Sequence, residues 1–210
     1  MSLGSQTFEF VDTPLVFEIC RVEDLFAQKN NKSVGETICH PKYHRLASLV
    51  RRQYPESIER RLGEFLYDLK QHDDLFYREF LNTHGDGEYF EFRLEDPNVR
   101  QLKGLYCFTV DRHLKYIGKS TDTFGKRINQ GYGKIHPKNC YRDGQSTNCH
   151  LNGLIALTSD QVRLHIHPMR DDDTIEFTER ALILRYEPEW NFQLRGRLPS
   201  PMGPATPLET

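Results

Sequence analysis

Apolar side chains fill two short runs near the middle of the chain, at residues 105–110 and 114–117, and the polar triplet Asp111-Arg112-His113 separates them. Two apolar runs divided by so short a polar turn are typical of a β-hairpin. Further along, residues 162–167 alternate between apolar and polar side chains, which is the period of a half-buried strand. The pattern therefore predicts a small sheet in the second half of the chain.

Apolar residues at helical spacing flank these strands along the sequence. They predict helices at three places: residues 122–129, 148–157 and 173–186. Thr121 or Asp122 can cap the start of the first helix, and Gly131 and Gly133 can end it. The polar residues 134–147 between the first two helices predict a loop.

The first hundred residues show a less regular pattern. Their apolar spacing predicts five elements: strands within 6–20 and 89–93, and helices at 44–52, 55–69 and 73–81. Residues 28–42 are polar and predict a loop, and Asp96-Pro97-Asn98 is the expected boundary. The chain is thus expected to have three parts: a mainly helical accessory region at 1–98, an α/β (α+β) domain at 99–196 and a Pro-rich disordered tail at 197–210.

Composition narrows the class of protein. With 37% apolar and 28% charged residues, the 210-residue chain can bury a core and remain in solution. No apolar run approaches the length of a membrane span, and the first five residues lack the apolar stretch of a signal peptide. The five cysteines are an odd number without C-x-x-C spacing, which fits reduced thiols. These features predict a cytoplasmic protein without a membrane partner.

Charge is distributed unevenly along the chain, although the net charge is only −2. Residues 101–150 hold nine Lys and Arg but three Asp and Glu, a net charge of +6, whereas the segments on either side are both net negative. This basic block coincides with the hairpin and the helix after it. The coincidence predicts that one face of the protein meets a polyanion.

Two triplets mark the hairpin, Gly104-Leu105-Tyr106 on its first strand and Tyr116-Ile117-Gly118 on its second. Together with Arg127, Glu179 and Asn191 in the same order, they make the chain resemble the GIY-YIG nucleases, with leucine in place of the first isoleucine. The resemblance covers roughly the second half of the chain. It implies a small mixed β-sheet flanked by helices and the activity of a metal-dependent DNA endonuclease.

Glu179 stands out without any family knowledge. Its helix neighbours at i−4, i+3 and i+4 are Ile175, Leu182 and Ile183, so its carboxylate lies on the apolar stripe. Burying an unpaired carboxylate costs several kcal/mol, and a cation is therefore expected beside it. A divalent metal or Arg127 would serve, and a structural salt bridge is the alternative interpretation.

The resemblance also implies roles for the other motif residues. Tyr106 or Tyr116, more often the first, would activate the attacking water, although an unperturbed phenol has a pKa of about 10 that must be lowered for this task. Arg127, eleven residues after Tyr116, would bind the phosphate. Glu179 would hold one Mg²⁺ or Mn²⁺ ion, and Asn191 would support the site.

One position departs from the family pattern. Many members carry His or Tyr four residues after the arginine, where this chain has Gly131. Tyr132 and His136 are both predicted candidates for that role. Among polar and basic side chains near the motif, six are predicted to contact DNA: Lys119, Lys126, Lys134, Arg142, Gln145 and Asn148. A solvated loop is the alternative for the last three.

Several functions remain open at this stage. The motif lies near the end of the chain, a layout that looks more like the small restriction-type members. Double-stranded DNA is the expected partner of this chain, and a homodimer is one expected arrangement. The accessory region would then serve DNA recognition or dimerisation. The alternatives are a catalytically silent DNA-binding module, a homing-type nuclease, and a repair or structure-specific nuclease for branched DNA or RNA.

Overall fold

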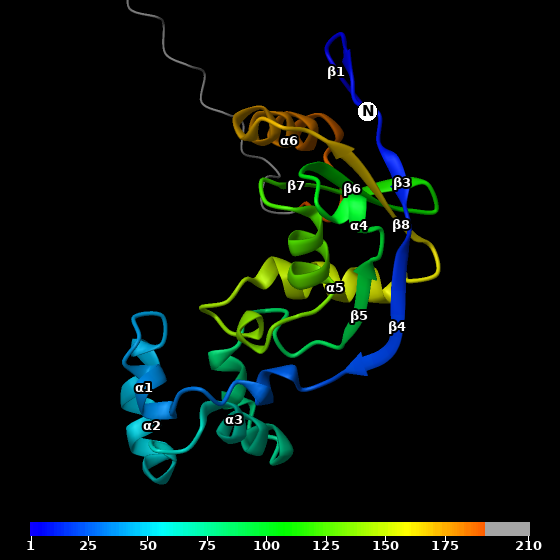
Figure 1. Cartoon of the computed structure of the whole chain (residues 1–210). Coiled ribbons are helices and arrows are strands. Elements are labelled where there is room, and N and C mark those ends of the chain that lie inside the picture. Colours follow the sequence, from blue (N-terminus) through cyan, green and yellow to red (C-terminus); the bar gives the residue numbers. More distant parts are fainter. Residues whose placement is uncertain (192–210) are drawn as a thin grey trace, which may run out of the picture.

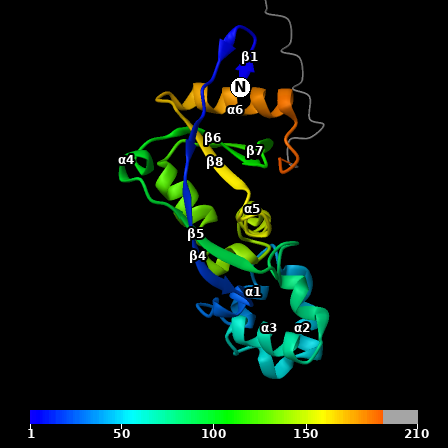
Figure 2. The ribbon, with the colours of Figure 1, turned by 90° about the vertical axis from the view of Figure 1, so that its right-hand side faces the viewer.

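The computed structural model describes residues 1–191, except for the side chains of Ile19 and Cys20. The Pro-rich tail expected at 197–210 and the last residues of the domain expected at 99–196 lie outside the described residues. A body built on a β-sheet carries a lobe of short helices at one end, and a long two-stranded ribbon runs between the two (Figures 1 and 2).

Four antiparallel strands form the sheet of the body. In spatial order they are β3 (Val11–Thr13), β8 (Val162–Pro168), β6 (Gly104–Val110) and β7 (His113–Ser120). Asp111 and Arg112 form the two-residue turn between β6 and β7, and both have positive φ, 47° and 67°, as a type I′ hairpin requires. The expected hairpin and the strand at 162–167 are confirmed.

The expectation of a mixed sheet is wrong for the described strands. The tight turn forces β7 to run antiparallel to β6, and β8 also pairs antiparallel with β6 and with β3. Within the described residues, each pair of neighbouring strands in this sheet is therefore antiparallel. The coarser expectation of an α+β arrangement, with helices around antiparallel strands, is confirmed.

Helices cover both faces of this sheet. On one face α6 (Asp172–Tyr186) packs against the hairpin, where Ile175 and Leu182 meet Leu105 and Ile117. The other face lies under the π-helical segment η5 (Lys126–Tyr132) and the helix α5 (Ser146–Leu157). Because side chains alternate along a strand, Tyr106 and Tyr116 point to this second face.

The segment after the hairpin departs from the expected α-helix that ends near residue 129. The chain instead continues to Tyr132 in π-turns, and the amide of Gly133 bonds to the carbonyl of Ile128 five residues earlier at 2.6 Å. Gly133 also faces the ribbon so closely that a Cβ atom there would lie 1.9 Å from the carbonyl oxygen of Phe92. Contact with the ribbon therefore ends this helix.

The lobe consists of short helices with connecting turns. They are η1 (Leu25–Gln28), α1 (Val34–Ile38), η2 (His44–Leu46), α2 (Ala47–Gln53), η3 (Pro55–Ser57), α3 (Leu62–Gln71) and η4 (Leu75–Phe80). The expected loop at 28–42 contains α1, which a capping box of Ser33 and Glu36 starts. The helix expected from residue 55 begins only at Leu62, because residues 58–60 bond to the start of α1 instead.

The ribbon connects the lobe to the body, and the remaining short elements complete the described chain. They are β4 (Leu15–Val22), which pairs with β5 (Tyr89–Leu94), together with β1 (Ser2–Leu3), β2 (Gln6–Thr7), α4 (Pro97–Arg100) and η6 (Pro137–Cys140). The domain boundary expected at residue 98 stays a prediction. β3, which precedes this residue in the sequence, pairs with β8 in the sheet of the body. Among the described helices, none combines the length and the apolar character needed to cross a membrane.

The expected polar loop at 134–147 has a second role. Ile135, Cys140 and Tyr141 are buried in the core of the lobe, and the Tyr141 hydroxyl donates to the carbonyl of Phe26 at 2.9 Å. The loop therefore fastens the lobe to the body. These three residues are isolated apolar positions in a polar segment, so the sequence pattern did not predict their contact with the lobe.

Candidate active site

Three tyrosine hydroxyls meet beneath η5. Tyr106 and Tyr132 share a hydrogen bond of 2.7 Å, and the Tyr116 hydroxyl lies 3.5 Å from that of Tyr132. Tyr106 and Tyr132 are fully buried, and Tyr116 is nearly so. Tyr106 comes from β6, Tyr116 from β7 and Tyr132 from the end of η5.

Arg127 closes this cluster toward the outside. Its Nε donates to the Tyr106 hydroxyl at 3.2 Å, and its guanidinium lies over the Tyr132 ring, 4.8 Å from the centroid. In a π-turn the residue five positions on takes the place that the fourth has in an α-helix. The structure thus brings Tyr132, rather than His136, beside the arginine.

Glycine is required at both ends of the motif. Gly118 lies directly opposite Tyr106 in the hairpin register, and a Cβ atom at Gly118 would lie 2.4 Å from the Cζ and hydroxyl oxygen of Tyr106. Gly104 has a φ of 142°, and a Cβ atom there would lie 2.3 Å from the carbonyl oxygen of His167. Gly118 leaves room for the phenol of Tyr106, and Gly104 lets the start of β6 lie close to the end of β8.

The substitution Gly118→Ala is expected to displace the Tyr106 ring and to lower the free energy of unfolding by about 1–3 kcal/mol, the usual cost of overpacking a core. Thermal denaturation would measure the loss. Gly153→Ala in α5 is the matched control, since its Cβ would meet no atom within 4 Å. The control is expected to gain up to about 1 kcal/mol from helix propensity. Equal stability of the two variants would contradict the close contact at Gly118.

Glu179 lies on α6 between buried neighbours, as its spacing predicted. Ile175 and Leu182 are fully buried, and the Glu179 side chain is only 16% exposed. The cation in contact with it is Lys119, whose Nζ is 3.5 Å from Oε2 and also bonds to Glu176. Burial raises the pKa of Glu179, and the charges of Lys119 and Arg127 oppose this shift.

Asn191 fixes the edge of the hairpin. Its side-chain oxygen accepts from the amide of Ile117 at 2.8 Å, and its Nδ2 donates to the carbonyl of Ile117 at 2.7 Å. Next to it the amide of Trp190 bonds to the carbonyl of Lys115 at 2.8 Å. These bonds satisfy the outer edge of β7 and hold the second triplet in place. Asn191 therefore supports the site from behind.

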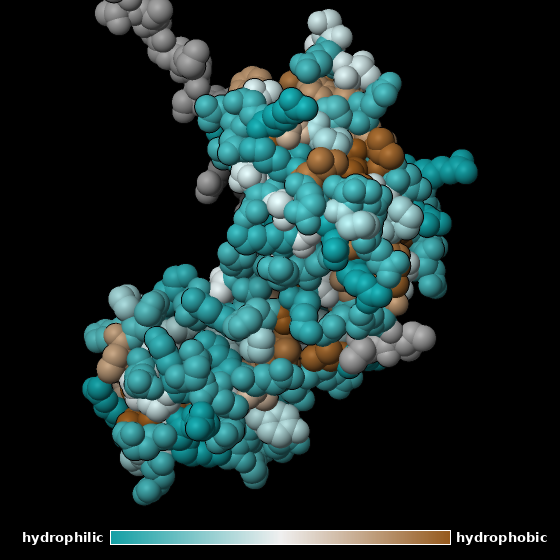
Figure 3. Space-filling view, in the orientation of Figure 1, coloured by the Kyte–Doolittle hydropathy of each residue, from teal (hydrophilic) through white to brown (hydrophobic). Residues whose placement is uncertain are grey.

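A cleft of about 660 Å³, here termed the site cleft, opens beside these residues. It lies between the end of β7, η5, α6 and the segment 138–148. In the space-filling view the outline of the molecule is indented between the body and the lobe, and the surface there is mainly hydrophilic (Figure 3). Six residues singled out from the sequence line the site cleft: Lys119, Lys126, Arg127, Gln145, Asn148 and Glu179.

The other sequence candidates lie elsewhere or behind the cleft wall. Lys134 pairs with Glu91, and Arg142 pairs with Glu79. His136 lies at the start of η6, where its Nδ1 accepts from the amide of Lys138. Gln130 and Lys138 are among the lining residues that the sequence did not single out. The charge of Lys138 within the basic block was a signal for it, whereas nothing in the sequence marked Gln130.

The protonation of the phenols follows from their burial. Burial raises the pKa of both Tyr116 and Tyr132 well above that of a free phenol, so both remain neutral hydroxyls near pH 7. The cationic donor Arg127 bonds to the oxygen of Tyr106 instead. Of the three phenols, Tyr106 is thus the one whose oxygen accepts a hydrogen bond from a cationic side chain.

The fit of a divalent metal depends on Glu179. Within residues 1–191, no three His, Cys, Asp or Glu side chains gather in a group that could hold a metal ion. A single carboxylate with water and phosphate oxygens is nevertheless a donor set that Mg²⁺ accepts. The partly exposed Glu179 carboxylate on the cleft wall fits such a site.

Comparison with protein-family models, curated proteins and solved structures finds no match for this chain.

Proposed function

We propose that this chain is a metal-dependent DNA endonuclease of the GIY-YIG type. The observation that carries the proposal is the convergence of Arg127, Lys119 and Glu179 on one cleft, with the Tyr106 phenol bonded directly behind Arg127. Lys119 and Arg127 come from β7 and η5, which are neighbours in the sequence, whereas Glu179 comes from α6 much further along the chain. A cation for phosphate, a phenol for proton transfer and a lone carboxylate for a metal are the parts that phosphodiester hydrolysis needs.

The chain's own residues divide the work. A DNA phosphate that enters the site cleft meets Lys126 and the guanidinium of Arg127, which can bond two phosphate oxygens at once. The Nε of Arg127 keeps its bond to Tyr106 while the two terminal nitrogens bond the phosphate, so the cation stays against the phenol oxygen. Tyr106 first gives its own proton to water in the site cleft, and the phenolate, still bonded to the neutral hydroxyl of Tyr132, then takes a proton from the attacking water.

Glu179 would hold one Mg²⁺ or Mn²⁺ ion. The ion, when bound, stabilises the charge that builds up on the phosphate and the leaving oxygen. Lys119, which neutralises Glu179 in the structure, can turn to the phosphate once a cation replaces it at the carboxylate. The exposed Glu176 remains as a second partner for Lys119.

Double-stranded DNA is the proposed substrate, and a restriction-like role is the preferred setting. One site cleft serves one phosphate at a time, so cutting both strands at one place needs a second copy of the chain or a second encounter. A homodimer with two-fold symmetry would match the symmetry of a duplex. The catalytically silent DNA-binding module remains the rival function.

Incubation of the pure protein with supercoiled plasmid and Mg²⁺ tests this proposal. We expect nicked or linear DNA with Mg²⁺ and intact plasmid when EDTA removes the metal. Discrete fragments would indicate sequence specificity, and a smear would indicate none. Plasmid that stays intact with Mg²⁺ and with Mn²⁺, but shifts on a native gel, would replace the endonuclease proposal by the binding module.

A further inference from the structure

A second cleft lies in the lobe, on the other side of the segment 142–148. This lobe cleft has a volume of about 790 Å³, and Lys42, Arg78 and Arg142 line it. Arg142 and Ser146 face the lobe cleft, whereas Asp143, Gly144, Gln145 and Asn148 face the site cleft. The two clefts therefore share one wall.

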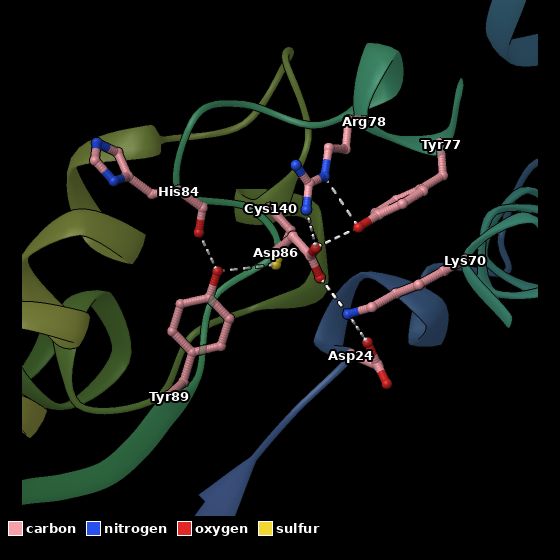
Figure 4. A network of polar contacts seen from close by, with 8 residues as sticks. All are labelled: Asp24, Lys70, Tyr77, Arg78, His84, Asp86, Tyr89 and Cys140. Carbon is pink, nitrogen blue, oxygen red and sulfur yellow. Dashed lines mark hydrogen bonds and ion pairs between the residues drawn. The ribbon is translucent and has the colours of Figure 1, made fainter. Parts of the chain in front are cut away.

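Asp86, the one acid that lines the lobe cleft, is paired with Lys70 and Arg78. Asp86 bonds to Lys70 at 2.6 Å and to the hydroxyl of Tyr77 at 2.5 Å, and Lys70 also reaches Asp24 (Figure 4). Arg78 lies 3.9 Å from Asp86 and donates to the Tyr77 hydroxyl at 3.1 Å, but it remains 63% exposed. The lobe cleft thus keeps a surplus of positive charge.

Lys42 adds a cation with little competition. Its Nζ bonds to the backbone carbonyl of Arg142 at 3.3 Å, and no described ion pair involves it. A lysine on an exposed surface without an acid partner is available to a phosphate. Lys42 and Arg78 are therefore the two cations of the lobe cleft that a polyanion could bind with little loss of existing ion pairs.

The start of α5 on the shared wall favours an anion, and the acid on that wall, Asp143, is bonded to the Tyr43 hydroxyl. The twelve-residue helix α5 begins there at Ser146, and its N-cap residue Gln145 makes no side-chain capping bond. No acidic residue lies in its first turn. The positive end of a helix dipole thus points at the ridge between the two clefts, where a phosphate would cap it.

We propose that a DNA backbone crosses the start of α5 from the site cleft into the lobe cleft, where Lys42 and Arg78 bind its phosphates. This inference rests on the proposed function, and it gives the lobe the role of a second, sequence-independent grip on double-stranded DNA. The contacts are to phosphate, so they add affinity without reading bases. The fastened segment 134–147 keeps the two clefts in fixed register along the duplex.

The test compares the double variant Lys42→Ala/Arg78→Ala with the wild type. The affinity for a fluorescent duplex of about 30 base pairs is measured in Ca²⁺ over a range of salt concentrations. Removal of one cation from a phosphate reduces the steepness of log K against log salt by about 0.9, so the slope of the double variant is expected to be shallower by roughly two units. Its single-turnover cleavage rate at saturating duplex in Mg²⁺ is expected to match the wild type, because the site cleft is untouched.

The matched control is Arg51→Ala/Arg52→Ala, which removes two exposed cations from α2 of the same lobe outside both clefts. Its salt slope is expected to stay at the wild-type value. Lys42→Glu alone serves if the double variant fails to fold, since among the described residues the Nζ of Lys42 bonds to a backbone carbonyl and to no acidic side chain. A wild-type slope in a folded Lys42 variant overturns the inference even if the protein cuts DNA. A reduced slope without any cleavage by the wild type supports the grip and rejects the nuclease.

Discussion

Glu179→Gln is expected to reduce plasmid cleavage in Mg²⁺ by roughly 10³-fold or more and to leave duplex binding unchanged. The amide keeps the shape of the side chain but loses the anionic ligand of the metal. Charge stabilisation by a metal contributes several kcal/mol, and each 1.4 kcal/mol or so is tenfold in rate. Single-turnover cleavage measures the first effect, and duplex binding in Ca²⁺ measures the second.

Glu176→Gln is the control on the same helix. Glu176 also bonds to Lys119, but its side chain is 70% exposed and it does not line the site cleft. Its loss is expected to change the cleavage rate by less than a few-fold. If Glu179→Gln cuts as fast as Glu176→Gln, Glu179 is a structural partner of Lys119 and the metal assignment fails.

The raised pKa of Glu179 has two further consequences. The carboxylate takes up a proton at a higher pH than an exposed glutamate does, so metal-dependent cleavage is expected to fall off earlier on the acid side. The folded state also holds this charge at a cost near pH 7. Glu179→Gln is therefore expected to be at least as stable as the wild type in thermal denaturation, which separates loss of activity from loss of fold.

Tyr106→Phe is the second change with a large expected effect. The substitution keeps the ring over Gly118 but removes the oxygen that contacts Arg127 and Tyr132 at 3.2 and 2.7 Å. Loss of a general base typically costs about 10²–10⁴ in rate. The hydroxyl of Tyr116 makes only a 3.5 Å contact with Tyr132, and burial keeps it neutral. Tyr116→Phe is therefore expected to cost less, about tenfold, the value of a modest hydrogen bond.

Single-turnover cleavage by the two variants, with circular dichroism to confirm their folds, separates these roles. An inactive Tyr116→Phe beside an active Tyr106→Phe would reverse the assignment. Full activity in both would remove the phenols from proton transfer, and Lys119 on the cleft wall would become the next candidate. His136 is a weaker choice, because it lies at the start of η6 and does not line the site cleft.

Local patterns in the sequence predicted the features of this fold that depend on residues close together in the chain. The hairpin follows from two apolar runs and a short polar turn, and the position of Glu179 follows from the helical spacing of Ile175 and Leu182. Arg127 and Glu179 were both expected at the site on motif grounds, and both line the site cleft.

Contacts between distant segments decided the features that the sequence patterns did not reveal. Residues 58–60 leave the helical path because α1 offers them backbone partners. Tyr141 looks like part of a polar loop until the carbonyl of Phe26 is placed beside it. The pairing of Lys119 with Glu179 likewise joins β7 to α6 across sixty residues of chain.

The π-turn at the end of η5 makes this site tolerant of a difference in chain length. Gly131 occupies the extra position, and a Cβ atom there would meet no atom closer than 3.8 Å. A relative that lacks this one residue could close an ordinary α-turn and still set an aromatic ring against the same guanidinium. Alignments that count positions from the arginine would then pair Gly131 with that ring, whereas superposition in space would pair Tyr132 with it. For this helix the aromatic partner of Arg127 should be identified by its position in the turn. An insertion of one residue changes its sequence distance from the arginine but leaves its ring against the guanidinium.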